Sequence, residues 1–193
     1  MNLVARATGM LVSPRREWET VDTETTSIAE LYTGYIMPLA GIAAIVRFLS
    51  MTFIGTTVLG VSTRWTLTHG LMLTVIGYIT VLIMVYILAL VVDAAAPTFG
   101  AEKNQIQAFK VVAYSFTAAW IGGMLSVIPW FGWLGLVGGL YSLYILYLGL
   151  PVVMKCPRDK AAGYTVVIVL AAILVGLVIG IGMRMVAPGA MGM

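Results

Sequence analysis

Long runs of apolar residues, separated by short polar segments, dominate this chain. A helix needs about 20 apolar residues to cross the hydrocarbon core of a bilayer, where every backbone polar group must be satisfied within the protein. Five segments reach that length: Tyr35–Ile54, Thr68–Val92, Phe109–Ile128, Trp133–Met154 and Tyr164–Met185. The pattern therefore predicts an all-α polytopic bundle of five transmembrane helices within residues 31–187.

The first 30 residues follow a different pattern. A secretory signal peptide would place an apolar run and a cleavage site here, but Pro14 to Glu30 is polar and charged, so the first apolar segment is a retained span. Before it, apolar residues recur at helical spacing: Leu3, Val4, Ala7, Met10 and Leu11. Arg6 and Thr8 fall off that face. We interpret residues 1–30 as a cytoplasmic segment with a short amphipathic helix on the inner leaflet, and a frayed tail is the alternative.

The link between the third and fourth spans and the end of the chain each support one further prediction. The connection between the third and fourth spans, residues 129–132, is very short and carries no charge. Two helices joined so tightly must be antiparallel neighbours, so a helical hairpin is expected. Residues 188–193 are expected to form a short C-terminal tail.

The basic residues predict the orientation of the bundle. With the N-terminus inside, the cytoplasmic segments hold eight of them: Arg6, Arg15, Arg16, Lys103, Lys110, Lys155, Arg158 and Lys160. The outer segments hold only Arg64 and Arg184. The positive-inside rule therefore predicts a cytoplasmic N-terminus and an outer C-terminus, with Trp65, Trp130 and Trp133 at the outer interface. In a bacterium the membrane would be the cell inner membrane.

Composition excludes several classes of function. Only 10% of residues are charged and the mean hydropathy is +1.01, whereas about a quarter of a soluble domain is charged. The net charge of +3 comes from bases that never form a run, which argues against nucleic-acid binding. Cys156 and His69 are the only residues of their types, so one subunit has no disulfide and no Cys/His metal cage. No catalytic motif is present, and neither an enzymatic role nor a cofactor is expected.

Arg47 is the one charge near the centre of a predicted span. A charge at that depth costs at least ~2.5 kcal/mol, so the side chain should face the bundle interior or a watery cavity. No acid lies at matching depth, which leaves carbonyls, water or hydroxyls such as Thr52, Thr74 and Thr80 as partners. Arg47 is thus a candidate functional residue, with a structural role and snorkelling to the outer interface as the alternative.

Asp93 stands at the inner C-terminal end of the second span. The helix dipole disfavours a carboxylate there by a few tenths to about 1 kcal/mol, so a compensating base is expected. Four bases share its side of the membrane: Lys103, Lys110, Arg158 and Lys160. We predict an ion-pair cluster around Asp93, and a solvated carboxylate at the loop end is an equal alternative. Asp159, just before the fifth span, is interpreted as a carboxylate stabilised by a helix N-terminus.

Two stripes of residues lie on the helix faces. Small residues recur every fourth position: Ala118, Gly122 and Ser126; Gly135 and Gly139; Ala172, Gly176 and Gly180. They indicate close helix packing within one bundle or, alternatively, an oligomer seam. Tyr141, Tyr144 and Tyr147 give the fourth span a phenol-bearing flank, which indicates interhelical hydrogen bonding or, alternatively, a polar crevice.

Three stretches together resemble the Yip-one domain family of five-span membrane proteins that interact with Ypt/Rab GTPases, and in particular its small bacterial branch. They are LVSPRREWETV with YIMPLAGI, VVDAAAPTFG with QAFKVVAYS, and YSLYILYLGLPVVMKCPRDKAAGYT, and the resemblance runs from Leu11 to about Ile179. It implies an all-helical bundle with a cytoplasmic N-terminus and, in nucleated cells, roles in vesicle trafficking with GTPase partners. This chain has only about 30 residues before its first span, whereas the trafficking members have a long N-terminal region.

These observations favour a non-enzymatic protein that organises or shapes the membrane, or scaffolds partners, through oligomerisation. Its expected partners are membrane lipids, anionic headgroups at the cytoplasmic face, and further copies of itself. The headgroups are expected because well-placed bases each contribute about 1 kcal/mol to headgroup binding. The competing hypothesis is a small channel or transporter for an ion or small solute, with Arg47 and the tyrosine flank lining its path.

Overall fold

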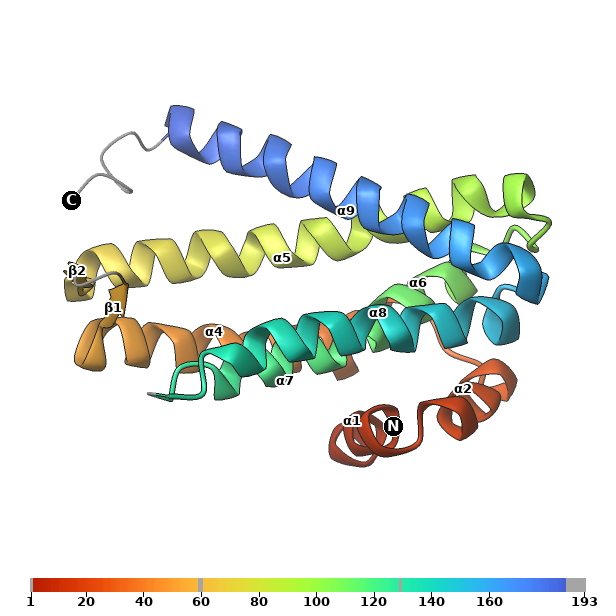
Figure 1. Ribbon diagram of the computed structural model, residues 1–193, viewed down its shortest axis with the longest axis horizontal. Coiled ribbons are helices and arrows are strands. Elements are labelled where there is room, and N and C mark those ends of the chain that lie inside the picture. Colours follow the sequence, from red (N-terminus) through yellow and green to blue (C-terminus); the bar gives the residue numbers. More distant parts are fainter. Residues whose placement is uncertain (1, 59–60, 129, 187–193) are drawn as a thin grey trace.

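The computed structural model describes residues 2–58, 61–128 and 130–186, and side chains are not described at 56–58, 61–62 and 182–186. This part of the chain is helical apart from one two-stranded hairpin (Figure 1). In chain order the elements are α1 (Leu3–Val12), α2 (Pro14–Thr23), α3 (Ile28–Leu31), the π-helical turn η1 (Tyr32–Ile36), α4 (Met37–Leu49), the π-helical turn η2 (Ser50–Ile54), β1 (Thr56–Val58), β2 (Val61–Thr63), α5 (Leu67–Ala95), the 3₁₀ turn η3 (Ala96–Phe99), α6 (Gln105–Ser115), α7 (Thr117–Leu125), α8 (Trp133–Val153) and α9 (Arg158–Val186).

Within the described ranges, five helical segments are long and apolar enough to cross a membrane, which confirms the five predicted spans. They are Ile28–Ile54, Leu67–Phe99, Gln105–Leu125, Trp133–Val153 and Arg158–Ile181. The first begins seven residues before its predicted start, because Ser27 and Glu30 form a capping box that initiates α3. Arg47 therefore lies in the last third of this span and not near its centre.

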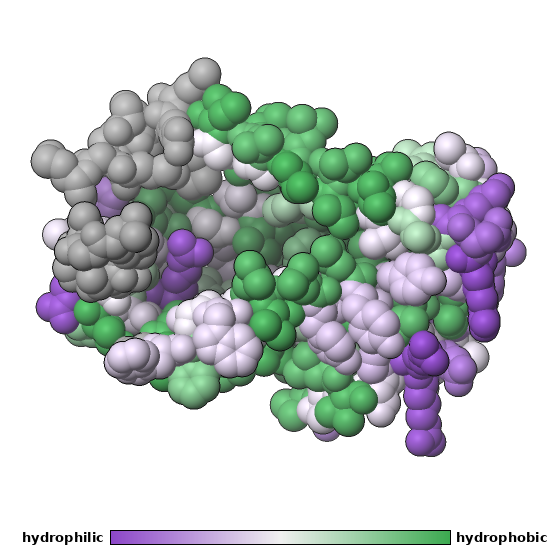
Figure 2. All heavy atoms as spheres, in the orientation of Figure 1, coloured by the Kyte–Doolittle hydropathy of each residue, from purple (hydrophilic) through white to green (hydrophobic). Residues whose placement is uncertain are grey.

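The two ends of the bundle differ in composition. One, here called the charged end, carries α1, α2 and the loops at 100–104 and 154–157. The other, the tryptophan end, carries the β-hairpin and the link from α7 to α8, with Trp65, Trp130 and Trp133. Figure 2 shows hydrophilic residues gathered at the charged end and a broad apolar surface between the ends. This banding is the one expected of a protein solvated by lipid.

The N-terminal helices pack against the charged end of the bundle (Figure 1). In α1, Ala7 and Met10 are buried, whereas Val4 is 69% exposed. Arg6 is only 6% exposed, so the prediction that it falls off the packed face is wrong. The reason is that its acidic partners lie on and just after α2, a helix that the hydrophobic pattern did not predict.

The α7–α8 hairpin confirms that the third and fourth spans are antiparallel neighbours. Their backbones touch at Gly122 and Gly138: a Cβ built on Gly138 would lie 2.4 Å from the Ala118 carbonyl oxygen and 2.9 Å from the Gly122 Cα. Gly122 thus serves packing inside the chain. Its partner Gly138 is not in the predicted stripe, where Gly135 meets only the Ser126 side chain, at 3.4 Å.

The other small residues of the predicted stripes do not lie at a close backbone contact of this kind. A Cβ on Gly139, Gly176 or Gly180 would meet nothing within 4 Å, so these three positions make no close contact within the described chain. Ala172, on the same helix as the last two, packs partly against the core.

The core is concentrated toward the charged end. Along α9, Ala161, Tyr164 and Ile168 are buried, whereas Leu174 and Leu177 are about 60% exposed (62% and 58%). Figure 1 shows α9 diverging from the other helices toward its C-terminal end. The bundle is therefore tight at the charged end and open at the tryptophan end.

The β-hairpin lies in the connection between the first and second spans and was not predicted. Thr56 pairs with Thr63 in antiparallel register. Gly55 adopts φ +80° where η2 ends, and the Arg64 Nε donates a hydrogen bond of 3.1 Å to the Ile54 carbonyl. Arg64 therefore caps the C-terminal end of the first span.

Candidate functional site

Two features of the fold carry polar chemistry, and the first is a charge network at the charged end. The Arg6 guanidinium pairs with Glu17 at 2.6 Å and with Glu24, and it lies 5.4 Å from the centroid of the Tyr114 ring. Burial alone would lower the pKa of Arg6, but the hydrogen bond and charge of Glu24, with smaller contributions from Tyr114 and Glu17, raise that pKa overall. Arg6 therefore stays charged and ties α1 to α2.

Lys110 of α6 joins this region to the bundle. Its side chain is 2% exposed, and its ammonium donates to the Val21 carbonyl at 3.0 Å and to the Glu24 carbonyl at 2.6 Å. These are the carbonyls at the C-terminal end of α2, where the helix dipole is negative. Lys110 thus acts as a cap from a neighbouring helix, and it lies in this network and not beside Asp93.

Replacing Lys110 with Met should loosen the segment between α2 and α3. The methionine fills the buried space but leaves two carbonyls without a donor, which should lower the free energy of unfolding by about 2 kcal/mol. A glutamate-specific protease should then cut after Glu24 faster than in the unmodified protein. Lys103→Met, a change at an exposed lysine, is the control. Equal cleavage rates for both variants and the unmodified protein would contradict the capping role.

Trp18 docks α2 on α8. It is fully buried, and its indole Nε1–H donates to the Ile145 carbonyl at 3.0 Å. The ring lies directly over Gly149, where a Cβ would come within 2.6 Å of it. Tyr141 adds a second link, because its hydroxyl donates to the Leu11 carbonyl at 2.8 Å. Sequence reasoning did not select Trp18, although a single tryptophan in a polar segment was the available signal.

The predicted ion-pair cluster around Asp93 is wrong. Within the described residues, ion pairs join Arg6 to Glu17 and Glu24 and join Lys155 to Asp22, and none includes Asp93. Asp93 is half-buried, and its Oδ1 is buried without a hydrogen-bond partner in the described part of the chain. The bases pair elsewhere because α1 and α2 bring their own acids to this end.

The remaining predicted residues of the charged end lie apart from one another. Lys103 is exposed in the loop between η3 and α6. Asp159 lies in the first turn of α9, where its charge meets the positive end of the helix dipole. Lys160 follows it, exposed, with its ammonium near Gly100. Tyr144 of the tyrosine flank is 42% exposed and contacts Tyr141 ring to ring at 5.7 Å.

Cys156 lies in the loop before α9 and has no chemical partner for redox work. The thiol is buried, and burial, with a smaller contribution from the charge of Asp159, raises its pKa. A thiol held protonated is a weak nucleophile and a weak metal ligand. Cys156 therefore acts as a small apolar residue.

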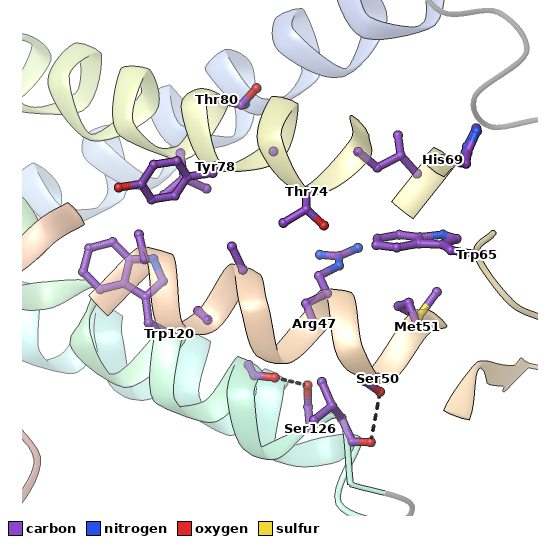
Figure 3. Close-up of a pocket in the computed structure, with 18 of the residues that line it drawn as sticks. Arg47, Ser50, Met51, Trp65, His69, Thr74, Tyr78, Thr80, Trp120 and Ser126 are labelled. Atoms are coloured by element: carbon purple, nitrogen blue, oxygen red, sulfur yellow. Dashed lines mark hydrogen bonds between the residues drawn. The ribbon is translucent and has the colours of Figure 1, made fainter. Parts of the chain in front are cut away.

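The second feature is a cavity of about 1120 Å³ toward the tryptophan end. It lies between α4, α5 and α7, and the loop before α5 closes one side of it (Figure 3). Most of its wall is made of small or apolar side chains, with a polar group at its outer part. The residues of that polar group are Arg47, Ser50, Thr63, Arg64, Thr66, His69 and Thr74.

Arg47 projects from α4 into this cavity (Figure 3). Its guanidinium lies 5.9 Å from the centroid of the Trp65 ring, a cation–π distance. Of the hydroxyl partners considered for it, Thr74 and Thr80 line the same cavity, but the Thr74 hydroxyl donates to the Gly70 carbonyl at 2.7 Å. Thr52 does not line the cavity, and its buried hydroxyl has no partner among the described residues.

The inner part of the cavity is closed by aromatic side chains. Tyr78 and Trp120 lie at the end away from Trp65 (Figure 3), and the Tyr78 hydroxyl donates to the Met37 carbonyl at 3.3 Å. On the α7 side, the Ser50 hydroxyl donates to the Val127 carbonyl at 3.5 Å. The described cavity wall thus carries two arginines, Arg47 and Arg64, above an apolar floor. This arrangement suits binding and lacks a nucleophile with an adjacent base.

These features define a multi-span helical membrane protein, and within the described residues no group of three or more potential metal ligands is found. A match to the Yip1 domain covers residues 8–180, so the chain belongs to the Yip1 domain family, as its resemblance to the Yip-one family predicted. Members of this family are generally non-enzymatic membrane trafficking proteins. No curated protein and no solved structure matches the chain.

Proposed function

We propose that this Yip1-domain protein organises or shapes the bilayer, acting as a non-enzymatic scaffold. One observation carries the proposal: α1 and α2 are fixed to the half of the bundle that lies toward the charged end (Figure 1). Trp18 of α2 donates a hydrogen bond to a backbone carbonyl of α8. Lys110 of α6 donates to a carbonyl of α2, and Tyr141 of α8 donates to a carbonyl of α1. Two helices held firmly in one leaflet widen the protein there and not in the other, which is the asymmetry that bends a membrane.

The charges at this end support contact with anionic headgroups. Three acids of the N-terminal segment are engaged internally, Glu17 and Glu24 by Arg6 and Asp22 by Lys155. Exposed bases remain on the surface: Arg15, Arg16, Lys103, Arg158 and Lys160. Under the positive-inside rule this end faces the cytoplasm and the C-terminus lies outside, in the inner membrane if the cell is bacterial.

Self-association is part of the proposal. Gly139, Gly176 and Gly180 leave open space beside them, and small residues on a lipid-facing surface allow close approach of a second helix. A seam between copies would multiply the bending effect of one docked helix pair. Chemical cross-linking of the protein in vesicles should therefore yield dimers or larger species, and purely monomeric product would remove this part of the proposal.

A vesicle experiment tests the proposed function. The full chain is reconstituted into vesicles of phosphatidylglycerol and phosphatidylcholine, and vesicle diameter is measured by electron cryomicroscopy as the protein content rises. We expect smaller or tubular vesicles with the unmodified protein, and a weaker effect with the double change Arg15→Glu and Arg16→Glu, since each base near the surface contributes about 1 kcal/mol to headgroup attraction. Both side chains are exposed, so the fold should persist.

The control keeps the same reconstitution. A pure phosphatidylcholine vesicle should show the same modest response for both proteins, because the headgroup charge is absent. If the unmodified protein leaves the size distribution equal to that of protein-free vesicles in both lipids, the shaping function is excluded.

The cavity favours a second candidate function, a small channel or transporter. Arg47 would then select an ion or solute on its path. We expect no selective flux into vesicles, because Tyr78 and Trp120 bound the cavity on its inner side. Selective flux that disappears on Arg47→Leu would replace the scaffold with transport.

A further inference from the structure

We propose that the Arg47 cavity is a binding site for an anionic phospholipid from the leaflet at the tryptophan end. The phosphate would meet the Arg47 guanidinium, and an acyl chain would extend along the small apolar wall. This assigns a ligand to a site in the opposite half of the molecule from the docked helices. The proposal stands independently of membrane shaping.

No acidic side chain of the sequence lies near Arg47 along the chain. All eight acids of the sequence lie in segments 17–30 and 93–102 or at Asp159, which belong to the charged end. In the described part of the chain, the guanidinium makes no ion pair and no hydrogen bond, and the centroid of the Trp65 ring lies 5.9 Å from it. No described side chain therefore supplies the counter-charge, and a bound anion would supply it.

Arg64, at the same end of the bundle, is an arginine whose side-chain donors are bonded within the protein. Its Nε donates to the Ile54 carbonyl and its Nη2 to the Phe53 carbonyl, the orphan acceptors where the first span ends. Arg47 lies about two turns inside the span, where the carbonyls are already paired within the helix. Its five donors are thus available to a ligand, and the planar guanidinium matches the oxygens of a phosphate.

The position of Arg47 suits a lipid headgroup. Seven residues separate it from Ile54, so it lies about 10 Å from the end of the span. The neighbouring cavity residues Ser50, Thr66 and Thr74 are polar. Going toward the charged end along α4 and α5, the wall turns to small and apolar residues: Ala40, Ala43, Ala44, Gly77 and Val81.

This change from polar to apolar residues along one wall favours a lipid over a soluble anion as the ligand. A free phosphate would use only the polar part and leave the apolar part of a 1120 Å³ space unfilled. Concave sites of this kind bind ligands that bury most of their surface, with few polar groups to orient them. A phospholipid has both the phosphate and the chain that this wall fits.

Native mass spectrometry of the full chain, released from nanodiscs of equal parts phosphatidylglycerol and phosphatidylcholine, tests the proposal. We expect phosphatidylglycerol to be retained about tenfold over phosphatidylcholine, with the preference lost in Arg47→Gln and partly kept in Arg47→Lys, which preserves the charge but not the fork of donors. Lys103→Gln is the matched control, because it removes an exposed base at the charged end, outside the cavity, and it should retain the preference.

A competition arm identifies the source of the phosphate. Millimolar inorganic phosphate should not displace the bound lipid, because it makes no apolar contact. Displacement by inorganic phosphate would show a site for free anions and overturn the lipid assignment. Equal retention of the two lipids by the unmodified protein would overturn it too, as would a preference unchanged in Arg47→Gln.

Discussion

Replacing Trp18 with alanine should lower the free energy of unfolding by about 3–5 kcal/mol, the usual cost of deleting a buried tryptophan. The side chain is fully buried and meets Tyr114 edge-on at a centroid distance of 6.2 Å. Its loss also leaves the Ile145 carbonyl without the indole donor. Because both contacts hold α2 to the bundle, unfolding in mild detergent, followed by tryptophan fluorescence against denaturant, should shift strongly.

A matched variant separates docking from the loss of any tryptophan. Trp133→Ala removes the same side chain from a position that is 59% exposed, so stability should change by less than about 1 kcal/mol. Gly149→Ala should disturb the same contact from the α8 side, because the new methyl group would displace the Trp18 ring. A Trp18→Ala protein as stable as Trp133→Ala would show that α2 does not support the bundle.

Gly138→Ala is expected to lower the free energy of unfolding by about 3 kcal/mol, at the upper end of the cost of overpacking. Its Cβ would lie 2.4 Å from the Ala118 carbonyl oxygen and 2.9 Å from the Gly122 Cα. Both are backbone atoms, so a side-chain rotation cannot relieve the clash. The α7 and α8 helices must move apart. The shift is measured as thermal aggregation temperature or as resistance to denaturant in detergent.

The adjacent glycine provides the control for this change. A methyl group on Gly139 would have nothing within 4 Å of it, and replacing helical glycine with alanine stabilises by roughly 0.5–1 kcal/mol. Gly139→Ala should therefore be neutral or slightly stabilising. If the two variants behave alike, the α7 and α8 backbones are not in close contact at Gly138.

Hydrophobic length and the short link at residues 129–132 predicted the five spans and the antiparallel hairpin, because bilayer thickness imposes one length on every helix. Helix start signals are harder to read within a polar segment. The capping box at Ser27 and Glu30 and the proline that begins α2 are such signals, and the prediction used neither. Consequently it missed α2 and placed the start of the first span too late.

The site residues were predicted less well, since a sequence shows which charges share a side of the membrane but not which ones meet. Asp93 was assigned bases from its own side, whereas Arg6, Lys110 and Lys155 bond to groups in or next to α2. Arg47 was expected to face the interior or a cavity, and the structure places it in a cavity wall. Trp65 and Trp120, which share that wall, were not considered together with it, because nothing in their spacing links them.

The divergence of α9 has a consequence for which substitutions the protein tolerates. Beyond Ala172, Ile173, Leu174 and Val178 are more than half exposed, and in a bilayer these side chains would face acyl chains. Lipid tails have no fixed shape, so no particular aliphatic residue is required at these positions. Leucine, isoleucine and valine should exchange freely at these three positions, whereas Gly176 and Gly180 on the same helix should stay small if a second copy packs against them.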